Sequence, residues 1–283
     1  MAARLKPHMA DSKHPCREDS VCAVPVQRCH PGEAELAEDL IAQEVPVALV
    51  YNGISHVVMM ASPLDLEDFA VGFSLSEGIV AQVGEIYDIS LDYDPANLEQ
   101  GVAVNLTIAA QRQMELKRRR RNLTGRTGCG LCGTESLQEA VRPVSPVAPQ
   151  PLVDGAAVER AVATLVANQP LQAMTGAFHG AAWCDPHGNI LQLREDVGRH
   201  NALDKLLGHL RRSDVDLSQG FVLVSSRASY EMVYKSSRCG AATLVAVSAP
   251  TALALKQARE AGLNLIGFAR PGRHVVYHRA IEE

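Results

Sequence analysis

The second half of the chain alternates short apolar strands with amphipathic helices, and this order constrains the fold more than any other feature. Strand-like runs bounded by turn residues cover residues 177–184, 190–193, 221–224, 244–247 and 263–268. Apolar residues at helical spacing predict helices over residues 201–210, 230–237 and 252–261. This alternation favours an α/β layer with a largely parallel sheet, in which ligands bind at the carboxyl ends of the strands.

The first half predicts a smaller, β-rich part. β-favouring runs at residues 45–50 and 56–60 flank Asn52 and Gly53, a strong hairpin signal because both residue types tolerate positive φ. We expect a helix over residues 65–79 and strands over residues 86–93 and 102–108. Prolines between residues 143 and 151 are typical of an extended linker. The chain is therefore expected to be α/β (α+β overall), with an N-terminal part over residues 34–145 and a second domain over residues 146–283.

Residues 1–33 are expected to form a disordered tail. Prolines and charges without lasting periodicity cannot repay the entropy of ordering the backbone. The tail does hold residues that can bind metals, but their spacing matches no common zinc pattern and no metal site is assigned: His14, Cys16, Cys22, Cys29 and His30.

Composition excludes several classes of function. The 283 residues are 47% hydrophobic and 21% charged, and the net charge of -5 gives no electrostatic case for nucleic acid. The longest apolar runs are strand-sized, well short of the roughly 20 residues that a membrane helix needs. No secretory signal precedes the seven cysteines, so we expect reduced thiols in the cytoplasm.

One Cys-x-x-Cys pair, Cys129 and Cys132, lies in a glycine-rich segment over residues 127–133, the cysteine loop. Such a pair can form a disulfide, hold half of a zinc site or carry sulfur as a persulfide. A thioredoxin-like site would place the pair between a strand and a helix, and a zinc site would need two further ligands. The glycines and the basic run at residues 117–121 suit a mobile thiolate, although a solvated basic loop explains any single arginine.

Polar segments follow the expected strands at four places. Arg227 can bind a phosphate in a bidentate manner, whereas Ser229 beside it is explained as a helix cap. Residues 194–201 carry two carboxylates, two arginines and a histidine, which can orient a polar heterocycle or simply begin a helix. His179 lies on a strand, where a lone histidine is more often structural. At residues 268–273, Arg270 and Arg273 flank a Pro-Gly turn and suit a pyrophosphate or solvent.

These segments match no common nucleotide or zinc enzyme. The chain has no Gly-x-x-x-x-Gly-Lys-Ser/Thr motif and no Gly-x-Gly-x-x-Gly motif that opens a helix. A zinc deaminase would need His-x-Glu and Pro-Cys-x-x-Cys, yet Gly180 and Ala181 follow His179 and Gly128 precedes Cys129.

Four long strings carry a resemblance to a known family. They read TGAFHGAA from Thr175, EDVGRHNALDK from Glu195, SSRASYEMV from Ser225 and AVSAPT from Ala246. In this order they resemble the FdhD family of formate dehydrogenase accessory sulfurtransferases over about residues 40–278, and the cysteine loop falls at the family's place. The resemblance implies a cytidine-deaminase-like C-terminal layer with a mixed sheet and no zinc chemistry.

The resemblance also implies a function. Members take persulfide sulfur from a cysteine desulfurase and pass it to molybdenum bound by two molybdopterin guanine dinucleotides (Mo-bis-MGD), for a client formate dehydrogenase; the assembly is a homodimer. By position, Cys129 carries the persulfide and Cys132 assists or resolves it. The residues expected near the cofactor are His179, Arg227, Phe268, Ala269, Arg270, Pro271, Gly272 and Arg273. A non-catalytic chaperone that binds the molybdenum cofactor is the alternative.

Overall fold

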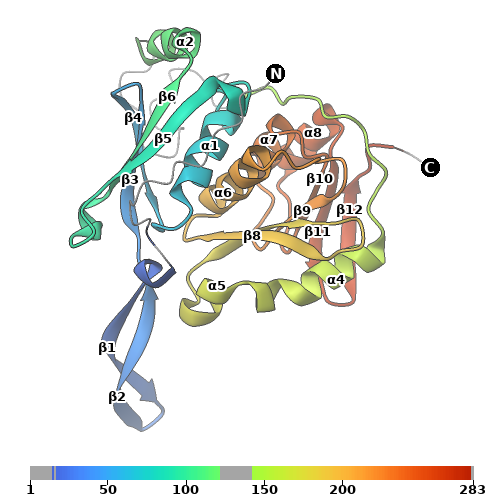
Figure 1. Cartoon of the computed structure of the whole chain (residues 1–283). Helices are drawn as coiled ribbons and strands as arrows, with labels where there is room; N and C mark the ends of the chain where they lie inside the picture. The colour runs from blue at the N-terminus through green and yellow to red at the C-terminus, as the bar shows by residue number, and fades with distance from the viewer. Residues whose placement is uncertain (1–14, 16, 122–141, 282–283) are drawn as a thin grey trace.

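The computed structural model describes residue 15 and residues 17–121 and 142–281, which form two main sheets with helices between them and a separate ribbon (Figure 1). The four-stranded sheet has the order β4-β3-β6-β5 and comprises β3 (Val45–Tyr51), β4 (Ile54–Ala61), β5 (Ile86–Asp92) and β6 (Val102–Ile108). Asn52 and Gly53 have positive φ between β3 and β4, which confirms the expected hairpin. α1 (Leu66–Ser76) packs against this sheet, and α2 (Ala110–Arg121) follows β6.

The six-stranded sheet confirms the expected α/β fold, and it is mixed, as the family resemblance implies. Its order is β12-β11-β10-β9-β7-β8. Three strands are parallel, namely β9 (Phe221–Val224), β10 (Thr243–Ala246) and β11 (Asn264–Arg270). β7 (His179–Cys184) runs antiparallel to both β9 and β8 (Ile190–Asp196), and β12 (Arg273–His278) runs antiparallel to β11; short turns join β7 to β8 and β11 to β12. The largely parallel sheet expected from the alternation of strands and helices is wrong, because only the pairs β9–β10 and β10–β11 are parallel.

Helices cover both faces of the six-stranded sheet. On one face lie α6 (Arg199–Arg212), α7 (Tyr230–Arg238) and α8 (Ala252–Ala261). α4 (Gly155–Leu165) and α5 (Pro170–Thr175), which the sequence analysis did not predict, lie on the other face and are joined by the short 3-10 turn Val166–Asn168 (Figure 1). The side chains of β9 alternate accordingly, since Phe221 and Leu223 join the core beneath α4 while Val222 and Val224 join the core around α6.

The expectation of a disordered tail over residues 1–33 is wrong for residues 17–33. Arg17–Ser20 form a 3-10 turn, and β1 (Val21–His30) pairs along its whole length with β2 (Glu33–Ala42) through a tight turn at Gly32, whose φ is 89°. We call β1 and β2 the ribbon. Pro25 obscured the strand pattern in the sequence, but an isolated ribbon has free strand edges where proline is tolerated. The ribbon projects away from both sheets (Figure 1).

α1 and α6 cross at a very close distance, and this contact joins the two main sheets. A Cβ atom built on Gly72 would lie 1.8 Å from the carbonyl oxygen of Asp204, and one on Gly208 would lie 1.9 Å from that of Asp68. Only glycine fits at these two positions, because real Cβ atoms do not approach backbone so closely.

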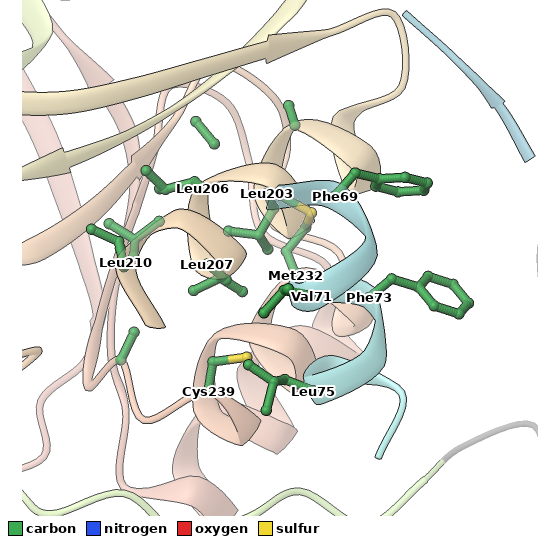
Figure 2. Packing of buried hydrophobic residues seen from close by; sticks show 14 of the residues in the cluster. Phe69, Val71, Phe73, Leu75, Leu203, Leu206, Leu207, Leu210, Met232 and Cys239 are labelled. Carbon is green, nitrogen blue, oxygen red and sulfur yellow. The ribbon is translucent and has the colours of Figure 1, made fainter. Parts of the chain in front are cut away.

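One continuous apolar core surrounds this crossing. Phe69 and Phe73 extend from α1 away from α6, whereas Leu203 and Leu207 of α6 lie on the side of α1 and α7 (Figure 2). The same cluster includes buried residues of the four-stranded sheet and of the six-stranded sheet. The boundary near residue 145 stays a prediction, but the two parts on either side of it share this core.

A buried ion pair links the same helices. The Asp204 carboxylate of α6 lies 2.8 Å from Lys235 Nζ of α7 and accepts a hydrogen bond of 2.7 Å from Ser76 Oγ of α1. Removing one partner of such a pair leaves an uncompensated charge in the interior, which typically costs about 3–5 kcal/mol. The pair therefore holds α1, α6 and α7 in one relative position.

We predict that Gly208→Ala destabilises the fold by about 1–3 kcal/mol or more, because the added methyl group forces α1 and α6 apart. Glycine-to-alanine changes inside unobstructed helices instead stabilise by roughly 0.5–1 kcal/mol, so the sign of the effect is diagnostic. Urea denaturation followed by circular dichroism measures it. Gly84→Ala is the matched control, since a Cβ there meets nothing within 4 Å. A Gly208→Ala variant as stable as the parent would contradict the close crossing.

Candidate functional site

Loops from several strands and the N-terminal ends of three helices meet at one edge of the six-stranded sheet. This C-terminal edge comprises residues 179–180, 196–200, 225–231, 248–251 and 268. Backbone hydrogen bonds connect its loops in sequence: Ser225 N donates to Gly180 O (2.9 Å), Ser248 N to Ser226 O (3.4 Å) and Phe268 N to Ser248 O (3.1 Å). The structure thus places His179, Arg227 and Phe268, all predicted from sequence, along one edge.

His179 and His200 lie beside Arg199 at this edge. His200 Nε2 lies 2.8 Å from Glu231 Oε2, and Ser229 Oγ lies 3.5 Å from the same nitrogen. Burial opposes ionisation of Glu231, but the hydrogen bond and charge of His200 still lower its pKa. Burial lowers the pKa of His179, and the nearby charges of Arg199 and His200 lower it further, so His179 is neutral at pH 7.

Arg199 is the residue here that sequence reasoning did not single out. It occupies the first position of α6, and its buried Nε has no hydrogen-bond partner among the described residues. A buried guanidinium nitrogen without a partner is uncommon, since most buried polar atoms are hydrogen-bonded. The signal was present in the segment 194–201, but the sequence could not show which of its charged groups were already paired.

Glu195 and Asp196, from the same segment, hold the fold. Asp196 is fully buried and forms a 2.6 Å ion pair with Lys205 Nζ, which is buried as well. Its carboxylate also accepts hydrogen bonds from Ser62 of the chain leaving β4. Glu195 accepts hydrogen bonds from two backbone amides at the start of α5, and burial raises its pKa despite them. Both carboxylates are therefore occupied by structural partners.

Phe268 adopts a strained backbone conformation at the end of the parallel strands. Its φ is 49°, a region that bulky residues rarely occupy and that costs on the order of 1–3 kcal/mol. The preceding Gly267 allows the approach of Pro250, whose Cδ would lie 2.7 Å from an added Cβ. Strain of this kind clusters at ligand sites, where the surrounding structure maintains it.

The rest of the predicted segment 268–273 divides into two environments. Ala269 is fully buried in the core beneath α4, so its side chain faces away from solvent. Arg270, Pro271, Gly272 and Arg273 are exposed at the β11–β12 turn, and Gly272 N donates a hydrogen bond of 2.7 Å to Glu159 of α4. Arg227 is exposed as well. These assignments as binding residues stay predictions.

Cys129 and Cys132 lie outside the described residues. The thiols that are described separate into two kinds. Cys22 and Cys29 are exposed on the ribbon, whereas Cys184 and Cys239 are buried. Burial raises the pKa of both buried thiols to about 12, so neither supplies a thiolate at neutral pH.

The described part of the chain shows no group of three or more His, Cys, Asp or Glu side chains arranged to hold a metal ion. Across the same residues, every helix is too short or too polar to span a membrane.

Comparison with known proteins identifies the family. The sequence matches the FdhD/NarQ family over residues 42–282. The chain belongs to this family. A sulfur carrier protein FdhD from Cupriavidus necator is 56% identical over 252 residues, covering 89% of this chain and 86% of the relative. A protein of the same name from Xanthomonas euvesicatoria pv. vesicatoria is 50% identical over 253 residues, covering 89% and 88%. The resemblance stated from the sequence is confirmed.

A solved structure supports the fold of this FdhD/NarQ family member. A formate dehydrogenase accessory protein from Desulfotalea psychrophila superposes with a TM-score of 0.72, covering 92% of this chain and 97% of that one. At 24% identity this likeness concerns the fold alone.

We predict that Arg199→Gln raises the pKa of His179, because one of the positive charges that oppose protonation is removed. The imidazole of His179 then binds its proton at a higher pH than in the parent protein. An NMR titration of the histidine side chains measures the change. Arg259→Gln on α8 is the control and should leave His179 unaffected; an unchanged or lower pKa in Arg199→Gln contradicts the expected charge interaction.

Proposed function

We propose that the chain is a sulfur carrier that serves formate dehydrogenase. The observation that carries this proposal is its 56% identity, over 89% of the chain, to a protein named as a sulfur carrier. The glycine-rich cysteine loop supplies a suitable carrier group, because sulfur transfer needs an accessible thiolate that can meet two different partners. The described buried thiols are unsuited to this role, since burial suppresses their ionisation.

Loading begins at Cys129. Its thiolate attacks the outer sulfur of a persulfide on a cysteine desulfurase, the donor S–S bond breaks, and the donor cysteine leaves as a thiolate. Cys129 then holds the sulfur as a persulfide. The basic residues that precede the cysteine loop favour the thiolate and attract an acidic donor surface.

Delivery uses Cys132. Its thiolate attacks the inner sulfur of the Cys129 persulfide, and the outer sulfur departs as sulfide to the molybdenum of the cargo. A disulfide between Cys129 and Cys132 remains, which an external thiol must reduce by two electrons before the next cycle. The carrier therefore acts as a sulfurtransferase with one sulfur atom per cycle.

The cargo is Mo-bis-MGD, held at the C-terminal edge. Its pyrophosphates are anionic, and guanidinium groups and helix N-terminal ends are suitable partners for such groups. Arg270 and Arg273 bind from the β11–β12 turn, Arg227 from the loop after β9, and the neutral His179 contributes a hydrogen bond. Phe268 contributes strained backbone beside them, and Pro271 and Gly272 contribute exposed backbone.

The proposed chemistry also implies the compartment and the partners of the carrier. The carrier works in the cytoplasm, where its thiols stay reduced, and meets a cysteine desulfurase and a formate dehydrogenase in turn. We also propose that it forms a homodimer.

The second candidate is a chaperone that binds the molybdenum cofactor without transferring sulfur. The unpartnered Nε of Arg199 at the C-terminal edge favours it, because a free guanidinium nitrogen can bind an anionic cofactor whatever the cysteine loop does. The two functions differ in their need for Cys129.

We predict that Cys129→Ala abolishes sulfur loading. The parent protein, incubated with a cysteine desulfurase and cysteine, should gain the mass of one sulfur atom that a thiol reductant releases, and the variant should gain none. Intact-protein mass spectrometry with peptide mapping measures this. Cys22→Ala removes an exposed thiol from the ribbon and is the matched control, so it should load normally.

The same variant separates the two candidates. A Cys129→Ala protein that still activates formate dehydrogenase and still binds a guanine nucleotide would establish the chaperone and refute the carrier. Sulfur found on any cysteine other than Cys129 would likewise overturn the proposed mechanism.

A further inference from the structure

The ribbon exposes far more apolar surface than an isolated pair of strands can support. None of its strand residues is buried, and Leu36 is 90% exposed. The register puts apolar residues on both faces: Cys22 lies opposite Ile41 on one face, and Ala23 lies opposite Leu40 on the other. A two-stranded hairpin alone is at best marginally stable in water, so a ribbon of this length needs a surface that covers it.

A second exposed apolar surface lies where the ribbon leaves the body. The base of β2 packs against α5. Residues 161–178, which include the end of α4 and all of α5, contain no charged side chain. Val166, Ala167, Ala173 and Met174 are exposed on this stretch, which we call the α5 surface. Uncharged exposed surface of this kind marks interaction sites in soluble proteins.

We propose that the ribbon of one copy of this chain lies along the α5 surface of a second copy. The proposal rests on the homodimer proposed above and names the elements that form its interface. One chain supplies both surfaces side by side, so a two-fold axis beside α5 lets each copy cover the other's ribbon at once. This reciprocal arrangement is the simplest one that hides both apolar surfaces.

The size of the contact is sufficient for a stable dimer. Ten residues per strand and two strands about 4.8 Å apart give a ribbon face of about 33 by 10 Å, so two fully covered ribbons with their receiving surfaces bury at most about 1,300 Å². Specific interfaces typically bury about 1,200–2,000 Å². The charges allow the contact as well: the ribbon carries Glu33, Glu35, Glu38 and Asp39 against Arg28, and the uncharged α5 surface has no acidic group to repel them.

Light scattering on the purified full chain tests the proposal. The parent protein should have about twice the chain mass of 30.4 kDa. The double variant Leu36→Asp/Ile41→Asp and the single variant Met174→Asp should both have the mass of one chain, with circular dichroism spectra like that of the parent. All three side chains are exposed, so the fold itself tolerates the changes. Tyr87→Asp is the matched control, an exposed apolar residue on the distant strand β5, and should stay dimeric.

A photo-cross-linker at position 36 identifies the contact directly. In a mixture of isotope-labelled and unlabelled protein, it should join Leu36's position to residues 161–178 of the other copy. A monomeric parent protein overturns both the dimer and the ribbon interface. A dimer that survives Leu36→Asp/Ile41→Asp, or cross-links that map elsewhere, overturns the ribbon interface and leaves the dimer standing. Sulfur loading at Cys129 is measured separately, so neither result is confused with failure of the carrier function.

Discussion

The close crossing of α1 and α6 determines how the two main sheets lie relative to each other. Gly72 and Gly208 let the backbones touch, and the flanking side chains then fill both sides of the crossing with one apolar core. Next to it, Asp204 satisfies Lys235 and Ser76 together, so three helices share one buried polar centre. Apolar packing alone tolerates some sliding of helices. The glycine contact and the ion pair remove that freedom, because each has only one geometry in which it can form.

The fixed position of the two main sheets also supports the C-terminal edge. The end of β4 reaches the edge through Ser62 and Met60, which bond to Asp196 and Asn201 at the start of α6. The N-terminal sheet thereby supports the segment that presents Arg199 and His200. Neither carboxylate of Glu195 and Asp196 is free for a ligand, and that occupation lets the neighbouring cationic groups keep their positive potential. Most charged groups of the segment 194–201 are therefore paired in space, whereas the buried Nε of Arg199 has no hydrogen-bond partner among the described residues.

The sequence predicts an element correctly where that element contains its own capping or turn residues. The helix expected over residues 252–261 agrees with α8 at both ends, because Thr251 caps its first turn and Gly262 ends it with a φ of 68°. The hairpin at Asn52 is a second example. α5 was missed because six residues provide too little periodicity, even with Pro170 at its first turn. The roles of Glu195 and Asp196 could not be read from sequence, since their partners are contributed by distant segments around residues 62, 171 and 205.

α7 connects the two regions on which the proposed function depends. Its first turn carries Glu231, which holds His200 at the C-terminal edge. One turn further, Lys235 binds Asp204 and Glu77, and Glu77 pairs in turn with Arg142, the first described residue after the segment that contains the cysteines. Burial would raise the pKa of Glu77, but the charges of Lys235 and Arg142 lower it to about 2, so these groups stay ionised at neutral pH. One helix therefore carries two separate sets of charged contacts, one to His200 at the C-terminal edge and one to Asp204 and Glu77, and the second set includes Arg142 through Glu77.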